Sequence, residues 1–581
     1  MNGDWWRALP SDHPARVGMR AIAAGKAEGS RVLRETGPGG GWRGVYGNQL
    51  PGKGGRLVER PSGTLPPSYL NSAITWLVTT DIYAPGSGNI GLPFNSARWG
   101  AVWEGAPHAV YVDTSFAVQL VRFDGSSWST VTSAAAVKGA RPCLGVAPNG
   151  TELAFAVNTA RAVISVFRSR NGWVAEPIPR IADDGTDLSA DRTWSVPALT
   201  VTDEASILLV FRVEETTSGT SAIYASAFDL SDGAWSAPTR VSENGATEDV
   251  DFPSVDHVRQ TTPGRAPGAR WRELPVAERG GPGSVVAERG GILQPPGLEW
   301  SRAGYNPWSL SRYPEPNATS TVWFCVVYEL QDNGGSTATS RILGHAVRDS
   351  DLAANGFRYA PGGVVSITGT DSARDPCVCA QEDGTFVVAY THISGRTATN
   401  EGASIDVVWA QAPDNPGSTT AGPSVSSAPG PLGGGGRTDT ALVWYGPQVV
   451  GSAYAVGNVR YPTNFPNLHA CRPHPAAGPI GVVWEQGTIT GYDSRQIGAA
   501  ACSDDPDDPA AWISFAGNQA ANSTTEQASY PSVWCEYDDF YAPDIVVHLF
   551  YMYGQEDDDP TTAANPTQPF KLVYRKGTWT P

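Results

Sequence analysis

The sequence predicts an all-β fold: a single β-propeller of six or seven four-stranded blades. A short unit recurs along the chain, with a Pro-led segment, two apolar β-rich runs and a tight turn that ends in an aromatic residue. Gly (65 residues) and Pro (47) are abundant, which suits many short strands joined by turns. Twenty Trp and twenty Tyr, with only 17% charged residues, indicate a folded chain.

The unit has six copies that carry the Pro. In the first copy, Pro142 precedes apolar runs at 153–157 and 163–167, and the turn ends at Trp173. The other copies begin at Pro197, Pro253, Pro376, Pro466 and Pro531. A seventh, more divergent unit at 98–128 lacks the Pro and ends at Trp128. One such unit cannot bury both of its faces alone, so the repetition favours blades stacked in a ring.

Each element of the unit has a physical reason. Pro donates no backbone hydrogen bond and is therefore expected at a strand start or on an edge. Gly permits the positive φ of a tight hairpin, as in the turn before Trp235. The aromatic residue is expected to pack in the apolar layer between neighbouring blades.

Three further segments complete the organisation. Residues 1–70 are predicted to form an N-terminal extension, and residues 71–581 to form the propeller. The Gly-rich part of the extension cannot build a core, whereas residues 21–34 suit a short helix. Two insertions lengthen it, at about 260–318 and about 411–462, the second becoming strand-like towards its end. Loops grow at small cost, yet loops of this length are uncommon without a role. Plain surface loops and contact arms towards a partner or ligand both stay open.

Composition narrows the classes of partner and compartment. The formal net charge of −17 disfavours binding to a phosphate backbone, so no nucleic acid is expected. The chain contains no run of about 18 apolar residues, so no membrane span is expected. The N-terminus has no apolar segment of the kind found in secretory signals. These features predict a virion or an extracellular location reached by a non-classical route, or a chain that stays inside a cell.

The ionisable and thiol groups do not predict a metal or cofactor. The seven Cys are sparse and odd in number, which favours buried free thiols over a disulfide framework. His469, Cys471 and His474 lie close in sequence but lack a zinc spacing. Cys377 and Cys379 alternate on one strand and are expected in the core.

The turn motif resembles the Asp box of sialidase-like propellers, which reads roughly Ser-x-Asp-x-Gly-x-Thr-Trp. The nearest match is 231–235, Ser-Asp-Gly-Ala-Trp, and the turns at 124–128 and 577–579 match less well. The resemblance covers about residues 98–581. It implies the propeller fold, and it implies a glycan as a ligand.

The same resemblance implies a set of catalytic groups. Sialidases of this class use three arginines to hold a carboxylate, a Tyr nucleophile paired with a Glu, and an Asp acid/base. Positions near strand starts that match these residue types are Arg141, Arg374, Asp375, Arg472 and Glu485. No Tyr/Glu pair is identified by motif.

Two classes of function follow. The first is a non-enzymatic recognition or structural propeller, a phage tail or other virion component, which contacts a host-surface glycan or a neighbouring virion protein through its N-terminal segment and insertions. The second is a glycan-active protein, either an exo-glycosidase resembling sialidases or a lectin. Convergent Arg, Tyr, Glu and Asp residues at the ring centre would favour the enzyme, because fold alone does not fix function.

Overall fold

The computed structural model describes Arg31–Glu35, Trp42–Tyr46 and most of 74–579. Within 74–579 the parts outside the described residues are 86–89, 93–96, 161–162, 190, 204–205, 230–232, 243–247, 262–284, 287–292, 295–319, 333–338, 350–351, 353–361, 367–370, 382–383, 394–403, 413–443, 453, 457–458, 462, 473–478, 489–490, 503–505, 507–510, 516–527, 538–544 and 554–570. No helix in the described part of the chain is long and apolar enough to cross a membrane.

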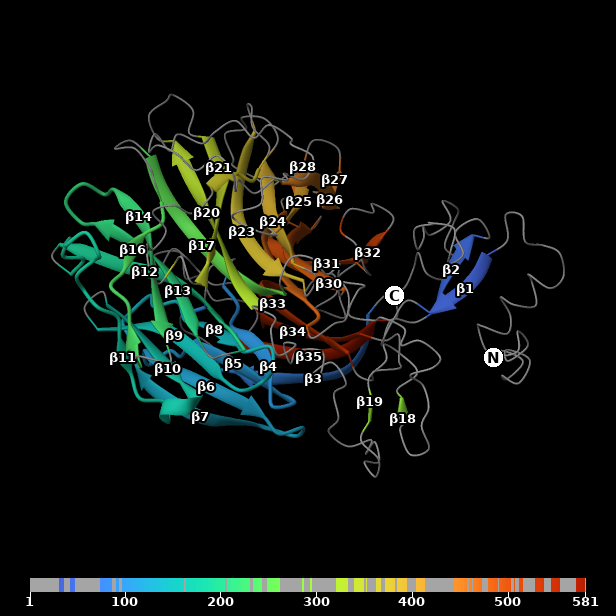
Figure 1. The fold of residues 1–581 in the computed structure, drawn as a ribbon, viewed down its shortest axis with the longest axis horizontal. Helices are drawn as coiled ribbons and strands as arrows, with labels where there is room; N and C mark the ends of the chain where they lie inside the picture. The colour runs from blue at the N-terminus through green and yellow to red at the C-terminus, as the bar shows by residue number, and fades with distance from the viewer. Residues whose placement is uncertain are drawn as a thin grey trace.

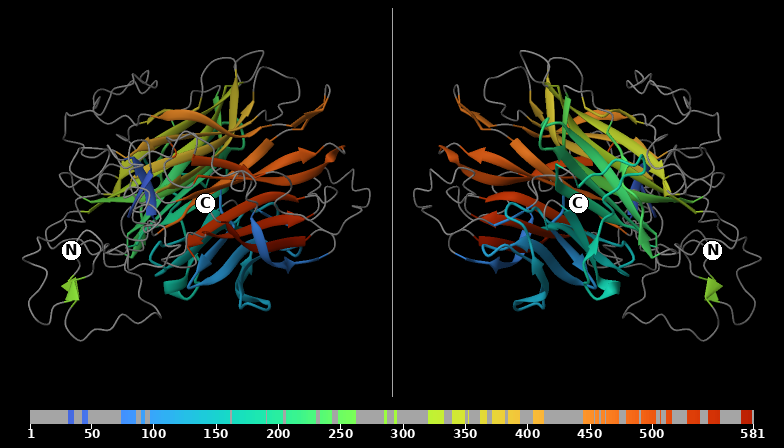
Figure 2. Two further views of the ribbon diagram at one scale, coloured as in Figure 1. Left: turned by 90° about the vertical axis from the view of Figure 1, so that its right-hand side faces the viewer. Right: turned by 90° about the vertical axis from the view of Figure 1, so that its left-hand side faces the viewer.

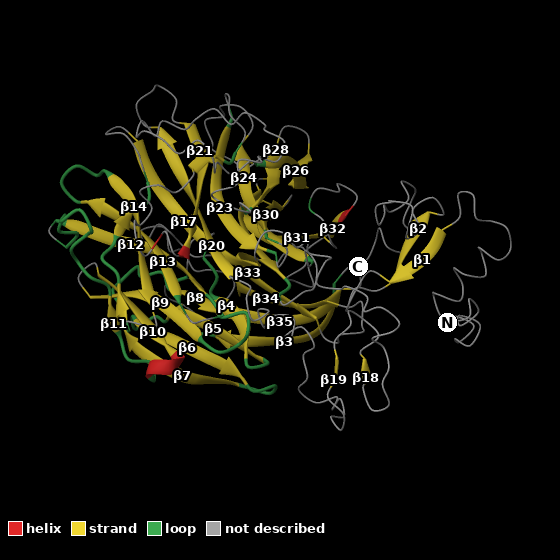
Figure 3. Cartoon of the chain, viewed as in Figure 1, coloured by secondary structure: helices red, strands yellow, loops and turns green. Residues whose placement is uncertain are grey.

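The described strands form seven antiparallel blades that follow one another around a ring (Figure 1). Strands dominate the fold, as Figure 3 shows. Blade 1 contains β4 (Gly100–Trp103), β5 (Ala106–Val112), β6 (Ala117–Phe123) and β7 (Trp128–Ala135); blade 2 contains β8 (Cys143–Val146), β9 (Leu153–Ala160), β10 (Val163–Arg168) and β11 (Glu176–Pro177), with the short 3-10 helix η3 (Ser169–Asn171) between the last two; blade 3 contains β12 (Arg192–Val201), β13 (Ile207–Glu215), β14 (Ser221–Asp229), β15 (Ala234–Trp235) and β16 (Thr239–Arg240).

The second half of the ring repeats this order. Blade 4 contains β17 (Glu248–Thr261), β20 (Ser320–Asp332), β21 (Thr339–Arg348) and β22 (Gly362–Val364); blade 5 contains β23 (Ser372–Ala380), β24 (Thr385–Ile393), β25 (Ser404–Gln411) and β26 (Tyr445–Ser452); blade 6 contains β29 (Thr463–Ala470), β30 (Ile480–Thr488), β31 (Gly491–Cys502) and β32 (Trp512–Phe515). The expected fold class is confirmed, with seven blades.

Blade 7 closes the ring with strands from both halves of the chain. Its sheet runs in the order β3 (Thr75–Tyr83), β35 (Lys571–Trp579), β34 (Ile545–Tyr553) and β33 (Ala528–Tyr537). In the side views, the red strands of this blade come from the C-terminal end of the chain, and the blue strand β3 lies beside them (Figure 2). Sequence periodicity did not identify β3, because its partner β35 is far away in the chain.

Among the described residues, three two-stranded hairpins lie outside the blade sheets. They pair β1 (Arg31–Glu35) with β2 (Trp42–Tyr46), β18 (Val285–Val286) with β19 (Leu293–Gln294), and β27 (Tyr454–Val456) with β28 (Val459–Tyr461). β1 corrects one expectation: residues 31–34, predicted to end a helix, are a strand, and 21–30 lie outside the described residues.

The insertions occupy different connections in two adjacent blades. The first lies between β17 and β20, the inner two strands of blade 4, and the second lies between β25 and β26 in blade 5. Strand β26 itself falls within the expected second insertion but is the fourth strand of its blade. Because β17 and β25 hold the first and third places in antiparallel sheets, both connections leave from the same face of the ring.

The recurring Pro marks a β-bulge in the innermost strand of five blades. The residue before each Pro has φ between 47° and 55°, and the pairing register shifts there. These five residues are Val196, Phe252, Asp375, Phe465 and Tyr530. A bulge leaves a residue unpaired, and Pro has no N–H to lose there. The Pro was expected at a strand start or on an edge; Pro142 directly precedes β8, and the other five lie at the bulge inside a strand that is the edge of its sheet.

Side chains just after the bulge accept hydrogen bonds from free backbone N–H groups at the innermost strand of the next blade. The residue after the Pro accepts a hydrogen bond from a backbone N–H of the following blade. Three such bonds run from Val378 to Ser254 (3.1 Å), from Val533 to Asn467 (3.0 Å) and, across the junction of blades 7 and 1, from Trp99 to Ser532 (3.4 Å). Buried backbone donors require such partners, so these short polar side chains hold neighbouring blades in register.

Two described aromatic turn residues, Trp235 and Trp128, pack between neighbouring blades, as the sequence predicts. Trp235 of blade 3 donates its indole N–H to Glu176 of blade 2 at 3.0 Å. Trp128 of blade 1 packs edge-on against Tyr574 of blade 7, with ring centroids 5.6 Å apart. Indole rings bury a large apolar area and keep one polar contact, so they join blades in both ways.

Candidate functional sites near the propeller axis

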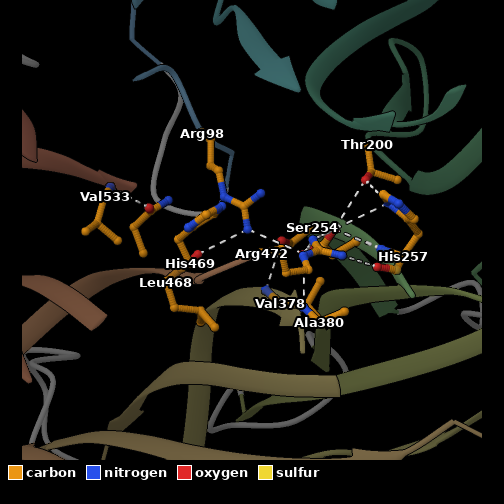
Figure 4. Close-up of polar contacts among 12 residues, drawn as sticks. Arg98, Thr200, Ser254, His257, Val378, Ala380, Leu468, His469, Arg472 and Val533 are labelled. Atoms are coloured by element: carbon orange, nitrogen blue, oxygen red, sulfur yellow. Dashed lines mark hydrogen bonds and ion pairs between the residues drawn. The ribbon is translucent and has the colours of Figure 1, made fainter. Parts of the chain in front are cut away.

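A buried carboxylate, Asp256 of β17, joins five blades. Its Oδ1 accepts a bond from the hydroxyl of Thr200 in blade 3 at 3.2 Å, and its Oδ2 accepts one from the backbone N–H of Ala380 in blade 5 at 3.0 Å. Arg472, just after β29 of blade 6, donates from one Nη to both oxygens at 2.8 Å. Arg98, just before β4 of blade 1, lies 3.5 Å from Oδ2. Figure 4 shows these side chains converging from separate strands.

The two arginines are also held by backbone carbonyls. Arg472 donates to the carbonyl of His257 at 2.6 Å, and Arg98 donates to the carbonyl of Leu468 in blade 6 at 3.2 Å. Their side chains are 9% and 15% exposed, and Asp256 is 1% exposed. We name Arg98, Asp256 and Arg472 the arginine cluster.

The charges of the arginine cluster set the protonation of its neighbours. Burial acts to raise the pKa of Asp256, but Arg472 and Arg98 outweigh it and hold that pKa well below the usual range. Burial, assisted by Arg472, lowers the pKa of His257 to about 4. Burial also lowers the pKa of His469, and Arg98 and Arg472 act in the same direction. At neutral pH the carboxylate is therefore ionised and both imidazoles are neutral.

A second polar group lies where the innermost strands of blades 4 and 5 begin. Asp251 precedes the bulge of β17, Glu329 is its register partner on β20, and Asp375 is the bulge residue of β23. The N–H of Asp375 donates to Glu329 Oε2 at 3.3 Å, and the hydroxyl of Thr391 donates to Asp375 Oδ2 at 3.2 Å. We name Asp251, Glu329 and Asp375 the carboxylate cluster. At 3.3 Å per residue, Asp251 is about 16 Å along β17 from Asp256.

Two arginines border the carboxylate cluster. The Nε of Arg374 is 3.7 Å from Glu329 Oε1, and the Nε of Arg212 in blade 3 is 3.8 Å from Asp251 Oδ1. Arg212 also donates to Glu214 at 2.6 Å. Glu329 is fully buried, whereas the side chains of Arg374 and Asp251 are 31% and 22% exposed. The group therefore leaves parts of one basic and one acidic side chain accessible to solvent.

Burial and the repulsion of neighbouring carboxylates raise the pKa of Glu329 and of Asp251. Burial, and then the negative charge of Asp375, raises the pKa of Glu329 to about 8, although Arg374 opposes the shift. Burial likewise raises the pKa of Asp251 against the opposing charge of Arg212. Glu329 is thus a carboxylic acid that is largely protonated at neutral pH.

The raised pKa of Glu329 predicts a specific pH dependence of stability. Between the usual Glu pKa near 4.5 and about 8, the folded protein binds more protons at Glu329 than the unfolded chain does. The contribution of Glu329 to the free energy of unfolding is therefore fully present at pH 4 and is lost as pH rises through 8. Urea titrations at several pH values should show this decline in the wild type. The decline should be smaller in Glu329→Gln, and equal slopes in both proteins would contradict the assignment.

A clamped imidazole lies next to the carboxylate cluster on β24. The Nε2 of His392 is 3.2 Å from Asp371, and its Nδ1 is 3.2 Å from Asp406. Hydrogen bonds that the ring of His392 donates to Asp406 and then to Asp371 raise the pKa of His392 against the effect of burial. Ser404 donates to Asp406 at 2.7 Å, so its hydroxyl hydrogen is already used. The group stabilises an imidazolium and does not provide a Ser nucleophile activated by a neutral base.

The residues predicted from strand starts fall into different groups. Arg374 and Asp375 lie together in or beside the carboxylate cluster, whereas Arg472 lies in the arginine cluster on a different carboxylate. Glu485 of β30 is buried and occupies the position in blade 6 that corresponds to Glu329 in blade 4; its register partner is Asn464. Arg141 precedes Pro142 and is half-buried. Arg374 and Arg472 therefore do not hold one shared ligand.

Sequence reasoning missed Arg98, Asp256, Asp251, Glu329 and His392. One signal was available for Asp256: a charged residue three positions after the Pro, inside an otherwise apolar innermost strand.

The expected buried thiols are confirmed, since all seven Cys are free and buried. Among the residues that the structure describes, no group of three or more His, Cys, Asp or Glu side chains could hold a metal ion. His474, one of three neighbouring ligand types in the sequence, lies outside the described residues, as do residues 231 and 232 of the turn that best matches the Asp box.

Comparisons with known proteins give distant structural likenesses only. No family model matches the sequence, and no curated protein matches it. Among solved structures, an α-L-arabinanase of Penicillium chrysogenum complexed with arabinobiose has 13% identity, covering 74% of this chain and 98% of that one, with a TM-score of 0.35. An ulvan lyase of polysaccharide lyase family PL25 has 8% identity, covering 85% and 95%, with a TM-score of 0.41. The fucose-specific lectin of Aleuria aurantia has 9% identity, covering 73% and 94%, with a TM-score of 0.30.

These neighbours include glycan-processing enzymes and a glycan-binding lectin. At such identities and TM-scores they carry no conclusion about the ligand or reaction of this chain. The resemblance to sialidase-like propellers rests on the turn motif and stays a prediction.

Proposed function

We propose that the protein is a recognition propeller that binds a glycan at the carboxylate cluster between blades 4 and 5. The observation that carries the proposal is the joint exposure of Arg374 and Asp251 above buried, hydrogen-bonded Glu329 and Asp375. Sugar hydroxyls both donate and accept hydrogen bonds, so a binding surface needs carboxylate acceptors beside fixed donors. The surrounding β-strands hold these groups rigidly, which reduces the entropy lost on binding.

Recognition is favoured over a sialidase-like reaction by the placement of the arginines. An arginine triad requires three guanidinium groups directed at one carboxylate of the ligand. Arg472 instead donates to Asp256, and Arg374 lies against Glu329. Arg472 is thus paired with a carboxylate of the protein itself, and Arg374 lies at a different carboxyl group, so these two arginines do not converge on one ligand.

Substituting Arg374 is expected to weaken glycan binding without unfolding the protein. Arg374→Ala removes a partly exposed donor, and hydrogen bonds to charged groups contribute about 1.5–3 kcal/mol, which corresponds to about 10- to 100-fold in affinity. The measurement is a glycan array with the wild type, followed by calorimetric titration of the best ligand with both proteins. Arg122→Ala, an exposed arginine of blade 1, is the control. Equal affinities in all three proteins would place the glycan site elsewhere.

One observation favours a second candidate function, glycoside hydrolysis. Glycosidases use a carboxylic acid of raised pKa beside a second carboxyl group, and Glu329, whose pKa is raised, lies next to Asp375. Fluorogenic glycosides test it directly. Turnover that is lost in Glu329→Gln, with glycan binding retained, would replace recognition by catalysis as the function. Binding without turnover in the wild type would support recognition.

The setting of this recognition is a further part of the proposal. We infer a virion component, such as a phage tail protein, whose N-terminal segment 1–70 and two insertions contact neighbouring virion proteins. The long insertions and the Gly-rich N-terminal segment support this setting. An antibody against the propeller should label particles in electron micrographs. Labelling confined to the soluble fraction would contradict this setting and leave the glycan-binding proposal intact.

A further inference from the structure

Arg98 is a surplus cation close to the centre of the ring. Both oxygens of Asp256 already accept 2.8 Å bonds from Arg472, so this pair is neutral by itself. Arg98 lies 3.5 Å from the same carboxylate as a second guanidinium. The arginine cluster, with two positive groups and one negative group, thus has a formal charge of +1. A charge removed from water is costly unless it is paired.

Arg98 also has a buried donor that no described residue uses. Its Nη2 donates to the carbonyl of Leu468 at 3.2 Å, but its Nε is buried and has no hydrogen-bond acceptor among the described residues. Buried donors are nearly always paired with protein, water or a ligand. The side chain of Arg98 keeps 15% exposure, so a small solute has a route to it.

A second donor lies beside Arg98. The ring of His469 accepts a hydrogen bond at Nδ1 from the N–H of Cys535 at 3.1 Å. Because Nδ1 accepts, the proton of the neutral ring is on Nε2, which is then a donor. His469 directly follows Leu468, the residue that Arg98 contacts, and Figure 4 shows the two side chains next to each other.

We propose that Arg98, with the Nε2–H of His469 beside it, binds a small monoanion near the propeller axis. The surplus of one positive charge matches a single negative charge, and the two N–H donors match an acceptor that carries no hydrogen. Chloride and a small carboxylate such as formate share this chemistry. The site is separate from the carboxylate cluster, and it does not depend on the glycan proposal.

Bromide, which replaces chloride and scatters X-rays anomalously, locates the anion directly in crystals of the full chain. The expected result is an anomalous peak within hydrogen-bond reach of Arg98 Nε in the wild type. Crystals soaked in sodium formate should show planar density at the same place if carboxylates bind. Absence of both signals at Arg98 would overturn the proposal, and this measurement requires no substituted protein.

Thermal unfolding tests the same site in solution. Melting temperatures are measured in sodium gluconate, chloride and formate at one ionic strength, because a ligand that binds only the folded state raises the melting temperature. Chloride or formate should raise the wild-type value in a saturable way. Arg98→Lys keeps the charge but removes the Nε donor and should lose this increment, whereas Arg122→Lys should keep it. A rise shared equally by both variants, or equal values in all salts, would show that Arg98 only links blades 1 and 6.

Discussion

Replacing Asp256 by Asn is expected to lower the free energy of unfolding by about 3–5 kcal/mol, the usual effect of removing one partner of a buried ion pair. The substitution keeps the shape of the side chain but leaves the Arg472 guanidinium buried at 9% exposure without its carboxylate. Asn also has a single acceptor oxygen, whereas Asp256 accepts bonds from Thr200 on one oxygen and from Ala380 on the other. Contacts with several blades therefore weaken together.

Denaturant unfolding followed by tryptophan fluorescence measures this loss. The control is Asp124→Asn in an exposed turn of blade 1, where Asn retains the acceptor oxygen that the amides of Ser126 and Ser127 contact. Because the pKa of Asp256 is held below the usual Asp range, its contribution should persist at pH 4 and be lost only as pH falls through the folded-state value. A shift of the denaturation midpoint no larger than that of the control would contradict the inference that Asp256 holds several blades together.

Removal of strand β3 is expected to destabilise the whole ring. Two deletions are compared, one that starts the chain at residue 74 and one that starts it at residue 85, so that the difference reports on β3. The longer deletion removes Ile74 and Ile82, both buried, and exposes the edge of β35. Burial of each aliphatic side chain contributes about 1.5–3 kcal/mol, so a loss of about 3–6 kcal/mol relative to the shorter chain is expected.

Loss of β3 also removes a ring contact and opens a sheet edge. Arg575 packs over the ring of Trp76 at 4.5 Å, and this contact disappears with the strand. An unpaired β35 is a template for pairing with another chain, so the longer deletion should also form oligomers in sedimentation velocity. Equal stability and equal mass for the two deleted chains would show that blade 7 is complete without β3.

The sequence predicts the blades where a local signal repeats. Five of the six Pro residues mark an innermost strand because the bulge tolerates a residue without an N–H, and the aromatic turns that end at Trp128 and Trp235 mark contacts with the preceding blade. β3 has no such signal, since its pairing with β35 joins Thr75 to Thr578 across almost the whole propeller. β26 falls in the strand-like end of the predicted second insertion, but the sequence pattern did not show that this segment is the fourth strand of blade 5.

The candidate site residues show the same contrast between a local sequence signal and contacts that only the folded ring creates. Arg374 and Asp375 were identified because they stand next to a Pro that marks a strand start. Asp256 was missed because the residues that neutralise it come from blades 1 and 6, and only the closed ring brings them together. Glu329 was missed for a related reason: its raised pKa depends on burial and on the neighbouring charge of Asp375 in the next blade.

The mixed origin of blade 7 also constrains the order of assembly during synthesis. β3 is made before any complete blade, but its only sheet partner, β35, is among the last described segments to be translated. At about 5–20 residues per second, the interval of roughly 500 residues lasts tens of seconds. Throughout that time β3 and the free faces of blade 1 are unpaired, while blades 2 to 6 can form from local hairpins. The nascent chain is therefore exposed to off-pathway strand pairing for far longer than any single hairpin needs to fold. A chaperone that covers these unpaired strands is expected to have its largest effect before the ring closes.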